Sequence, residues 1–210
     1  KIVLNDELKA KFNIVEISQE NKGVWARFDF ARKNVTSKYV CIFDDDTIPG
    51  KRWFENCMTE MIRQEGLYGT IGIIMTQPNK YPKSSSYFRV GWDGNLDYTA
   101  EVDFVGHSWF FKKEWLEDLL KAPKEIQEFK RAGEDMSFSY QLLKKGIKTF
   151  VPPHPKNNLE FYGSIPTKAV MLGKKMDVAV SGNKENTNDM NVAVNILLKS
   201  GWLTLKKKKS

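Results

Sequence analysis

Short apolar runs alternate with segments of helical spacing along most of this chain. The clearest strand covers residues 38–43, where apolar side chains follow one another almost without interruption, as expected of a strand buried on both faces. The other predicted strands cover residues 2–4, 12–17, 68–75, 87–90, 102–111 and 147–151. This alternation of strands and helices predicts an α/β fold with a mostly parallel central sheet covered by helices.

Helical spacing occurs between these strands, in segments that cover residues 23–32, 52–63, 113–121, 134–145 and 188–199. Pro123 ends the third of these helices, and Gly146 is a C-terminal cap for the fourth. Residues 77–86 are rich in Pro, Lys and Ser and are predicted to form a loop. Residues 156–186 are polar, contain glycines and show no clear pattern, so we expect a mobile flap there.

A chain of 210 residues is long enough for one α/β domain with a full core, but short for two domains. Its 41% hydrophobic and 28% charged residues are ordinary for a soluble globular protein. The formal net charge of +7 makes anionic partners plausible, and part of it comes from the lysines at residues 206–209. This run is expected to be a solvated tail, with weak contact to an acidic membrane surface as the alternative.

The chain has two cysteines, Cys41 and Cys57, and neither has the spacing of a disulfide framework or a zinc site. We therefore expect a reducing compartment, the cytoplasm. No stretch approaches the roughly 18–20 apolar residues that cross a bilayer, and no signal peptide is recognisable. A transmembrane segment is accordingly not expected.

Three consecutive carboxylates, Asp44, Asp45 and Asp46, directly follow the apolar strand at residues 38–43. Ligands of open α/β sheets bind at the carboxyl ends of strands, and side chains alternate along an extended chain, so Asp44 and Asp46 are expected to point the same way. Adjacent carboxylates repel one another unless a cation is present. Mg²⁺ and Mn²⁺ take oxygen ligands, including those of substrate phosphates. The triplet predicts a metal–diphosphate site, with an exposed acidic turn as the alternative.

Two groups downstream of this triplet can add to its chemistry. Glu134 and Asp135 open the helix at residues 134–145, where they either complement the helix dipole or supply a base. His154 follows the strand at residues 147–151 and stands between prolines, a rigid place suited to a third metal ligand. An isolated histidine is more often a hydrogen-bonded core or surface residue, so both roles stay open for His154.

The order of these motifs resembles the core of GT-A fold glycosyltransferases, which use nucleotide-sugar donors. The matching parts, in chain order, are Asp44 to Asp46, Gly106, Glu134 with Asp135, and His154. Residues 21–27 are also similar to the Asn-x-Gly…Ala-Arg stretch that precedes the Asp-x-Asp strand in that fold. The resemblance covers roughly residues 2–155 and implies a small antiparallel sheet on the acceptor side of the main sheet.

This resemblance implies a donor side of the site. Asp46, Asp44 and His154 would bind a Mn²⁺ or Mg²⁺ ion that bridges the phosphates of the donor, and Asp44 would also be placed to contact the ribose. Arg27 would bind the nucleotide phosphates, because a planar cation suits an anion. The remaining residues that the resemblance assigns to the donor are Asp45 and Asp6.

The resemblance also implies an acceptor side. Asp135 would be the base if the reaction inverts configuration, and Glu134 would bind the donor or acceptor sugar. The residues expected to contact the transferred sugar or the acceptor are Gly106, His107, Trp92 and Trp109. Sugars stack their C–H faces on aromatic rings, although aromatic side chains also dominate protein cores, so packing is the alternative for the tryptophans.

Taken over the whole chain, the resemblance implies a single domain at residues 1–210. Residues 1–110 would bind the nucleotide sugar and metal, and residues 111–210 would form the acceptor side, the flap and the last helix. The first strand of the fold, with its nucleotide-base loop, is not recognisable, which leaves the nucleotide open, with UDP favoured. A hexosyl or deoxyhexosyl group would move to a glycan or glycoprotein acceptor. Within the fold, the chain resembles the capsid glycosyltransferases of large algal viruses, which would place it in the host cytoplasm.

Three other functions compete with this one. A strand followed by Asp44 and Asp46 is also similar to haloacid-dehalogenase-type phosphatases, but Ile48 stands where that family has Thr. A basic module that binds nucleic acid or glycan would explain the net charge, but the lysines and arginines are dispersed and no RNA-binding aromatic signature occurs, so nucleic acid is not expected. A nucleotidyltransferase would need a glycine-rich phosphate loop near a lysine, which the sequence lacks.

Overall fold

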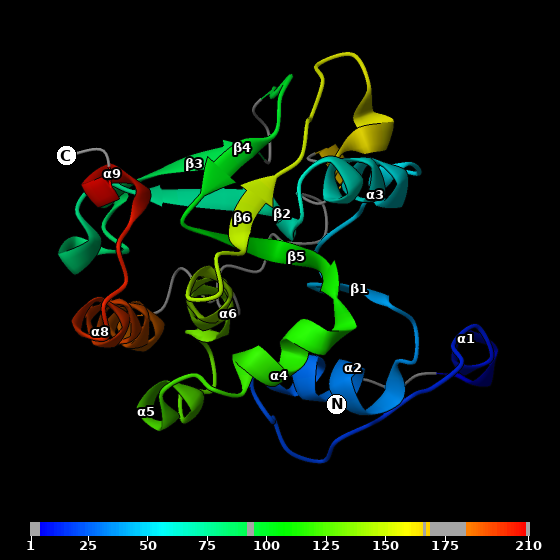
Figure 1. Cartoon of the computed structure of the whole chain (residues 1–210). Helices are drawn as coiled ribbons and strands as arrows, with labels where there is room; N and C mark the ends of the chain where they lie inside the picture. The colour runs from blue at the N-terminus through cyan, green and yellow to red at the C-terminus, as the bar shows by residue number, and fades with distance from the viewer. Residues whose placement is uncertain (1–4, 92–94, 166, 169–183, 209–210) are drawn as a thin grey trace.

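The computed structural model describes residues 5–91, 95–165, 167–168 and 184–208 of the chain (Figure 1). The predicted strand at residues 2–4 and the candidate sugar-binding residue Trp92 lie outside these ranges, as does most of the predicted flap at residues 156–186. Within the described part, Leu159–Phe161 forms a short 3-10 helix in the predicted flap.

A six-stranded sheet forms the centre of the molecule. Its strands run in the order β1-β5-β2-β6-β4, and β3 pairs with β2 beside this path. The strands are β1 Tyr39–Phe43, β2 Gly66–Met75, β3 Tyr87–Gly91, β4 Ala100–Val102, β5 Phe104–Lys112 and β6 Lys148–Val151. Strand β5 lies between β1 and β2 and is antiparallel to both, whereas β2 and β6 are parallel.

Helices cover both faces of this sheet (Figure 1). The described helices are α1 Asp6–Lys9, α2 Ala26–Asn34, α3 Trp53–Arg63, α4 Leu116–Leu119, α5 Lys124–Gln127, α6 Glu134–Leu143, α8 Lys184–Lys199 and α9 Leu205–Lys208. Figure 1 shows α2, α4 and α6 together on one side of β1 and β5, and α3 on the other side. Short 3-10 helices occur at Pro78–Lys80, Ser84–Ser86 and Lys113–Trp115.

Aromatic side chains fill the layer between β5 and the helices α2 and α6. The ring of Phe28 from α2 lies 5.4 Å from Trp109 and 5.7 Å from Phe138, measured between ring centroids. Phe111 packs edge-to-face on Phe138 at 4.9 Å. All four rings are at most 2% exposed. Such pairs add to the free energy of apolar burial, so this cluster fixes α2 and α6 against β5.

The predicted α/β class is confirmed, but the strand directions need correction. The expectation of a mostly parallel sheet does not match the pairing, because β2 and β6 are the only neighbouring strands of the described sheet that pair in parallel. The small antiparallel sheet is not separate either, since β3 and β4 belong to the same sheet. Strand β5 is nearly as buried and apolar as a central parallel strand, so its hydrophobic pattern gave no sign of its direction.

Two predicted strands also need correction. Residues 12–17 form no strand in the structure, because no neighbouring strand pairs with them, and Phe12, Ile14 and Ile17 are more than half exposed. The strand predicted at residues 102–111 is divided at Asp103, whose carboxylate accepts hydrogen bonds from the Met75 and Leu205 N–H groups. Among the described residues, no helix is long and apolar enough to span a bilayer.

Candidate active site

The acidic triplet begins where β1 ends. The Asp44 N–H donates to the carbonyl of His107 at 2.9 Å, which extends the β1–β5 ladder by one bond. The Thr47 hydroxyl donates to the same carbonyl at 3.0 Å and closes the turn that follows. Asp44 and Asp46 are half-buried and Asp45 is exposed, as the alternation of side chains along the chain predicts.

An irregularity in β5 directs His107 towards this triplet. The β2–β5 register pairs Gly69 with Trp109 and Ile71 with Gly106, so β5 has one extra residue here. His107 lies in this bulge with a φ of 65°, a conformation that costs a residue with a Cβ about 1 kcal/mol or more. Its Nδ1 atom lies 3.8 Å from an Asp46 carboxylate oxygen. The bulge therefore brings an imidazole to the acidic turn.

Asp44, Asp46 and His107 can hold a cation together. One ligand atom of each residue lies within 4.8 Å of the others. Two carboxylates and an imidazole suit Mn²⁺, and they suit Mg²⁺ less well because Mg²⁺ prefers oxygen ligands only. The donor set thus fits the divalent metal expected from the sequence, with one change among its members.

That change concerns His154, the predicted third metal ligand. It is fully buried away from the acidic turn, where its ring stacks on Tyr162 at 5.0 Å and Trp53 lies 5.9 Å away. Its Nε2 atom accepts a hydrogen bond from the Gly163 N–H, and burial lowers its pKa to about 4. The histidine close to Asp44 and Asp46 is His107 instead. His107 had been predicted from the sequence to contact the transferred sugar or the acceptor.

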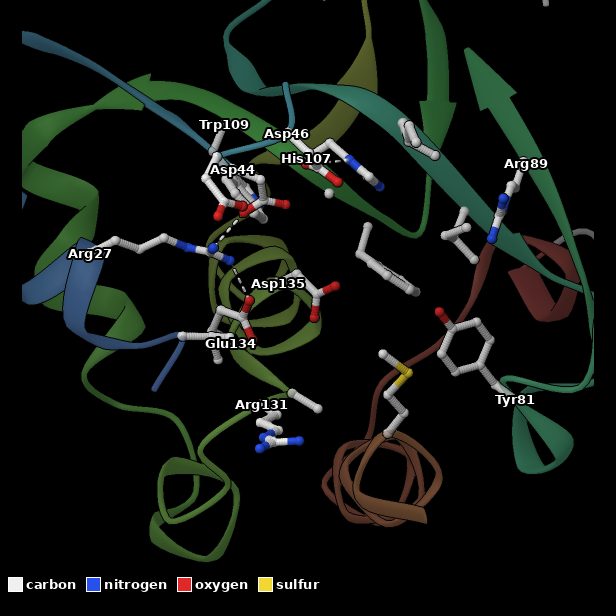
Figure 2. A pocket seen from close by; sticks show the side chains of 18 residues that line it. Arg27, Asp44, Asp46, Tyr81, Arg89, His107, Trp109, Arg131, Glu134 and Asp135 are labelled. Carbon is white, nitrogen blue, oxygen red and sulfur yellow. Dashed lines mark hydrogen bonds and ion pairs between the residues drawn. The ribbon is translucent and has the colours of Figure 1, made fainter. Parts of the chain in front are cut away.

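Helix α6 brings two more carboxylates to the same place. It begins after Gly133, whose φ of 99° and close contact with Ile126 exclude a larger residue. Glu134 and Asp135 form its first turn, and the Asp135 carboxylate accepts a hydrogen bond from the Met136 N–H at 2.7 Å. A left-handed glycine thus precedes the turn that brings both acidic side chains to the site, where Glu134 points to Arg27 and Asp135 into the pocket (Figure 2).

Arg27 from α2 connects the two acidic groups. Its guanidinium donates to the Asp44 carboxylate and, at 2.6 Å, to the Glu134 carboxylate. The same group lies over the Trp109 ring, 4.4 Å from its centroid, a favourable cation–π contact. Arg27 is therefore held on three sides, and its planar fork explains why arginine suits this position.

Three carboxylates of the site, those of Glu134, Asp135 and Asp44, resist ionisation. Burial raises the pKa of Glu134, and the charge of Arg27 opposes that rise. Burial, followed by the negative charge of Glu134, raises the pKa of Asp135 well above its ordinary range. Burial also raises the pKa of Asp44, against the effect of Arg27. Elevated carboxyl pKa values suit proton acceptors that work near neutral pH.

These groups line one cavity of about 440 Å³ (Figure 2). It brings together nine of the predicted residues, namely Arg27, Asp44, Asp45, Asp46, Gly106, His107, Trp109, Glu134 and Asp135. A Cβ atom added to Gly106 would meet no atom within 4 Å, so the backbone there is open to a ligand. Trp109 is 1% exposed beneath Arg27 and offers a sugar almost no ring surface.

Among the predicted residues that the structure describes, two do not line the cavity. His154 lies in the core, as described, and Asp6 lies in α1, where its exposed carboxylate pairs with Lys9 at 3.2 Å. The lining residues that the sequence analysis did not identify are Val24, Ile71, Ile73, Tyr81, Arg89, Phe104, Arg131, Ala132 and Met190. Arg131 carried a recognisable signal, a cation three residues before Glu134. The position of Arg89 depends on the pairing of β3 with β2, and Tyr81 lies in the connection between these two strands.

Comparison with known proteins agrees with this geometry. The sequence profile of glycosyl transferase family 2 matches residues 3–120, which is more than half of the 210 residues. No curated protein gives a significant match, so the resemblance to algal-virus capsid glycosyltransferases has no support. The profile match includes the acidic triplet and His107 and ends before Glu134. The chain belongs to glycosyl transferase family 2, and it is a glycosyltransferase of the GT-A-type α/β fold.

Proposed function

We propose that this protein transfers a hexosyl or deoxyhexosyl group from a nucleoside-diphosphate sugar, UDP favoured, to a glycan or glycoprotein acceptor. The observation that carries the proposal is a single cavity in which a candidate cation group lies beside a buried carboxyl pair. The first can neutralise a diphosphate leaving group, and the second can accept the proton of an attacking hydroxyl. A cytoplasmic location stays a prediction from the sequence.

Asp44, Asp46 and His107 would hold the divalent ion, which when bound supplies positive charge to the phosphates of the donor. This assignment replaces His154 with His107 and keeps both carboxylates of the sequence-based prediction. Mn²⁺ is favoured over Mg²⁺ because an imidazole is part of the donor set. Asp45 is exposed at the rim of the cavity, where it would contact the donor from solvent.

Asp135 would act as the base in an inverting transfer. Its raised pKa gives the carboxylate a strong affinity for a proton, and its position on a helix after Gly133 keeps it in place. Glu134 and Arg27 would act as positioning residues, because their ion pair ties the start of α6 to the acidic turn. When a donor diphosphate is bound, Arg27 would be shared between Asp44 and the phosphates.

The phosphatase alternative is not favoured by the same geometry. A nucleophilic aspartate needs an accessible carboxylate, whereas Asp44 is held by Arg27 and its pKa is raised by burial. The family match also favours transfer of a sugar over hydrolysis of a phosphate ester.

Thermal unfolding with UDP-sugars, in the presence and absence of Mn²⁺, tests the proposal. The wild-type protein should be stabilised by a UDP-sugar only when Mn²⁺ is present. Asp46→Asn should lose this stabilisation and sugar transfer together, because it removes one charge from the cation group. Asp29→Asn, in the outer ion pairs of α2, is the matched control and should behave as wild type. Metal-independent stabilisation, or full activity of Asp46→Asn, would refute the proposal.

A further inference from the structure

The cavity has a second part that the proposed chemistry does not use. Tyr81 and Arg89 line it on the side away from Arg27 and Asp44, and Asp135 lies between the two parts (Figure 2). Phe104 and Met190 also line the cavity, and the Phe104 ring lies 5.6 Å from that of Tyr81. Asp135 interacts electrostatically with Asp44 in one direction and with Tyr81 in the other. Whatever occupies this second part therefore lies next to the proposed base, Asp135.

Arg89 enters this part from β3. It pairs with Ile73 of β2, which also lines the cavity, and it lies on the same face of β3 as Tyr87, two residues earlier. Its guanidinium lies 5.9 Å from the Tyr87 ring centroid. No ion pair of Arg89 with a carboxylate occurs among the described residues. Arg27, by contrast, is occupied by two carboxylates.

Tyr81 places a hydroxyl beside Arg89 (Figure 2). Its ring is 8% exposed and is fixed by Tyr87 at 5.2 Å and Phe104 at 5.6 Å. Burial and the negative charge of Asp135 raise the pKa of this phenol, so the hydroxyl stays protonated and can donate a hydrogen bond. The positive charge of Arg89 opposes that rise, which indicates that the two side chains interact.

The chemistry of this part is therefore that of a small anion site with an apolar floor. A guanidinium and a protonated hydroxyl are donors that match a carboxylate or a phosphate, and Met190, which is only partly buried, can contact the carbon skeleton of a sugar. The geometry points to a subsite, formed by Arg89 and Tyr81, that binds an anionic group of the acceptor, a carboxylate or a phosphate, near the hydroxyl that attacks. This inference rests on the proposed function, because that function makes Asp135 the base.

The test measures binding of three probes to the full chain, with saturating UDP and Mn²⁺ present so that the donor side is occupied. The probes are glucuronate, glucose 6-phosphate and glucose, which carry a carboxylate, a phosphate and no charge. We expect one or both anionic sugars to bind at least tenfold more tightly than glucose by calorimetry, and the tighter one identifies the anionic group. Arg89→Gln should remove this preference, and Arg89→Lys should keep part of it.

Two controls separate the subsite from general attraction and from the proposed function. Arg63→Gln removes a surface cation on α3 that does not line the cavity, and it should keep the preference of the wild type. All variants should keep the stabilisation by UDP with Mn²⁺, which reports the donor side alone. Equal binding of the three sugars, or a preference that survives Arg89→Gln, would overturn the subsite and leave the proposed function intact. Loss of the UDP–Mn²⁺ effect in the wild type would overturn both.

Discussion

At the scale of single residues, Arg27 distinguishes the carboxylates of the site, because it pairs with Asp44 and Glu134 but not with Asp135. Arg27 pairs with Asp44 and Glu134 and thereby lowers their tendency to take up protons. Asp135 has no such ion pair among the described residues, and the neighbouring Glu134 carboxylate raises its pKa further. These adjacent residues of one helix turn therefore differ in their surroundings: Glu134 is held in an ion pair with Arg27, whereas Asp135 forms no ion pair among the described residues.

Asp135 gives a prediction about pH. A base must be deprotonated to act, so the raised pKa moves the loss of activity on acidification to a pH above that of an ordinary aspartate, about 3.9. Glu134→Gln removes the negative charge that helps raise this pKa, and the acid limb of the kcat/KM profile should then move to lower pH. Asp135→Asn should lower kcat by roughly 10²- to 10⁴-fold. An acid limb that stays in place in Glu134→Gln would contradict this assignment.

At the scale of elements, the bulge in β5 links the fold to the candidate metal site. The carbonyl of His107 receives hydrogen bonds from Asp44 and Thr47, so the bulge holds the acidic turn in place through its backbone. The imidazole of the same residue reaches Asp46. Because His107 has a positive φ, the same residue carries both backbone strain and a candidate metal-ligand side chain.

A pair of substitutions at His107 separates these two roles. His107→Gly relieves the positive φ and His107→Ala does not, so the glycine variant should be more stable by about 1 kcal/mol in urea unfolding. Both variants lack the imidazole and should bind Mn²⁺ about tenfold more weakly or worse. Equal stability of the two variants would argue against strain, and unchanged Mn²⁺ affinity in both would argue against His107 as a ligand.

The elements differ in how well the sequence predicted them. Strands β1 and β2 and helices α3 and α6 were recognisable because each has a long apolar pattern with clear ends. The direction of β5 was not, since a strand buried on both faces has the same apolar run in either direction. The bulge arises only from the pairing of β5 with β2, and this is why His107 was assigned to the acceptor and not to the metal. His154 was predicted as a third metal ligand because it occupies a rigid position after a strand, but such a position suits a core residue equally well.

At the scale of the whole molecule, the cavity joins segments that lie far apart in the sequence. The family profile covers residues 3–120, whereas Asp135 on α6 and Met190 on α8 come from beyond it. Elsewhere in the fold, His154 connects three other segments, since it lies between Trp53 of α3 and Tyr162 and pairs through its backbone with Leu96. His154 is thus a buried core residue, and the stability of the fold should depend on pH through its ring.

The sign of this dependence follows from the two pKa values of His154. Its pKa is 6.5 in a model peptide and about 4 in the folded protein, because burial disfavours the charged ring. Below pH 6.5 the unfolded chain therefore binds a proton that the folded protein does not, and stability falls until about pH 4, by on the order of 3 kcal/mol in all. His154→Gln cannot titrate, so its free energy of unfolding in urea should fall less steeply over this window than that of the wild type. Parallel curves for His154→Gln and the wild type would show that this buried imidazole is not the titrating group.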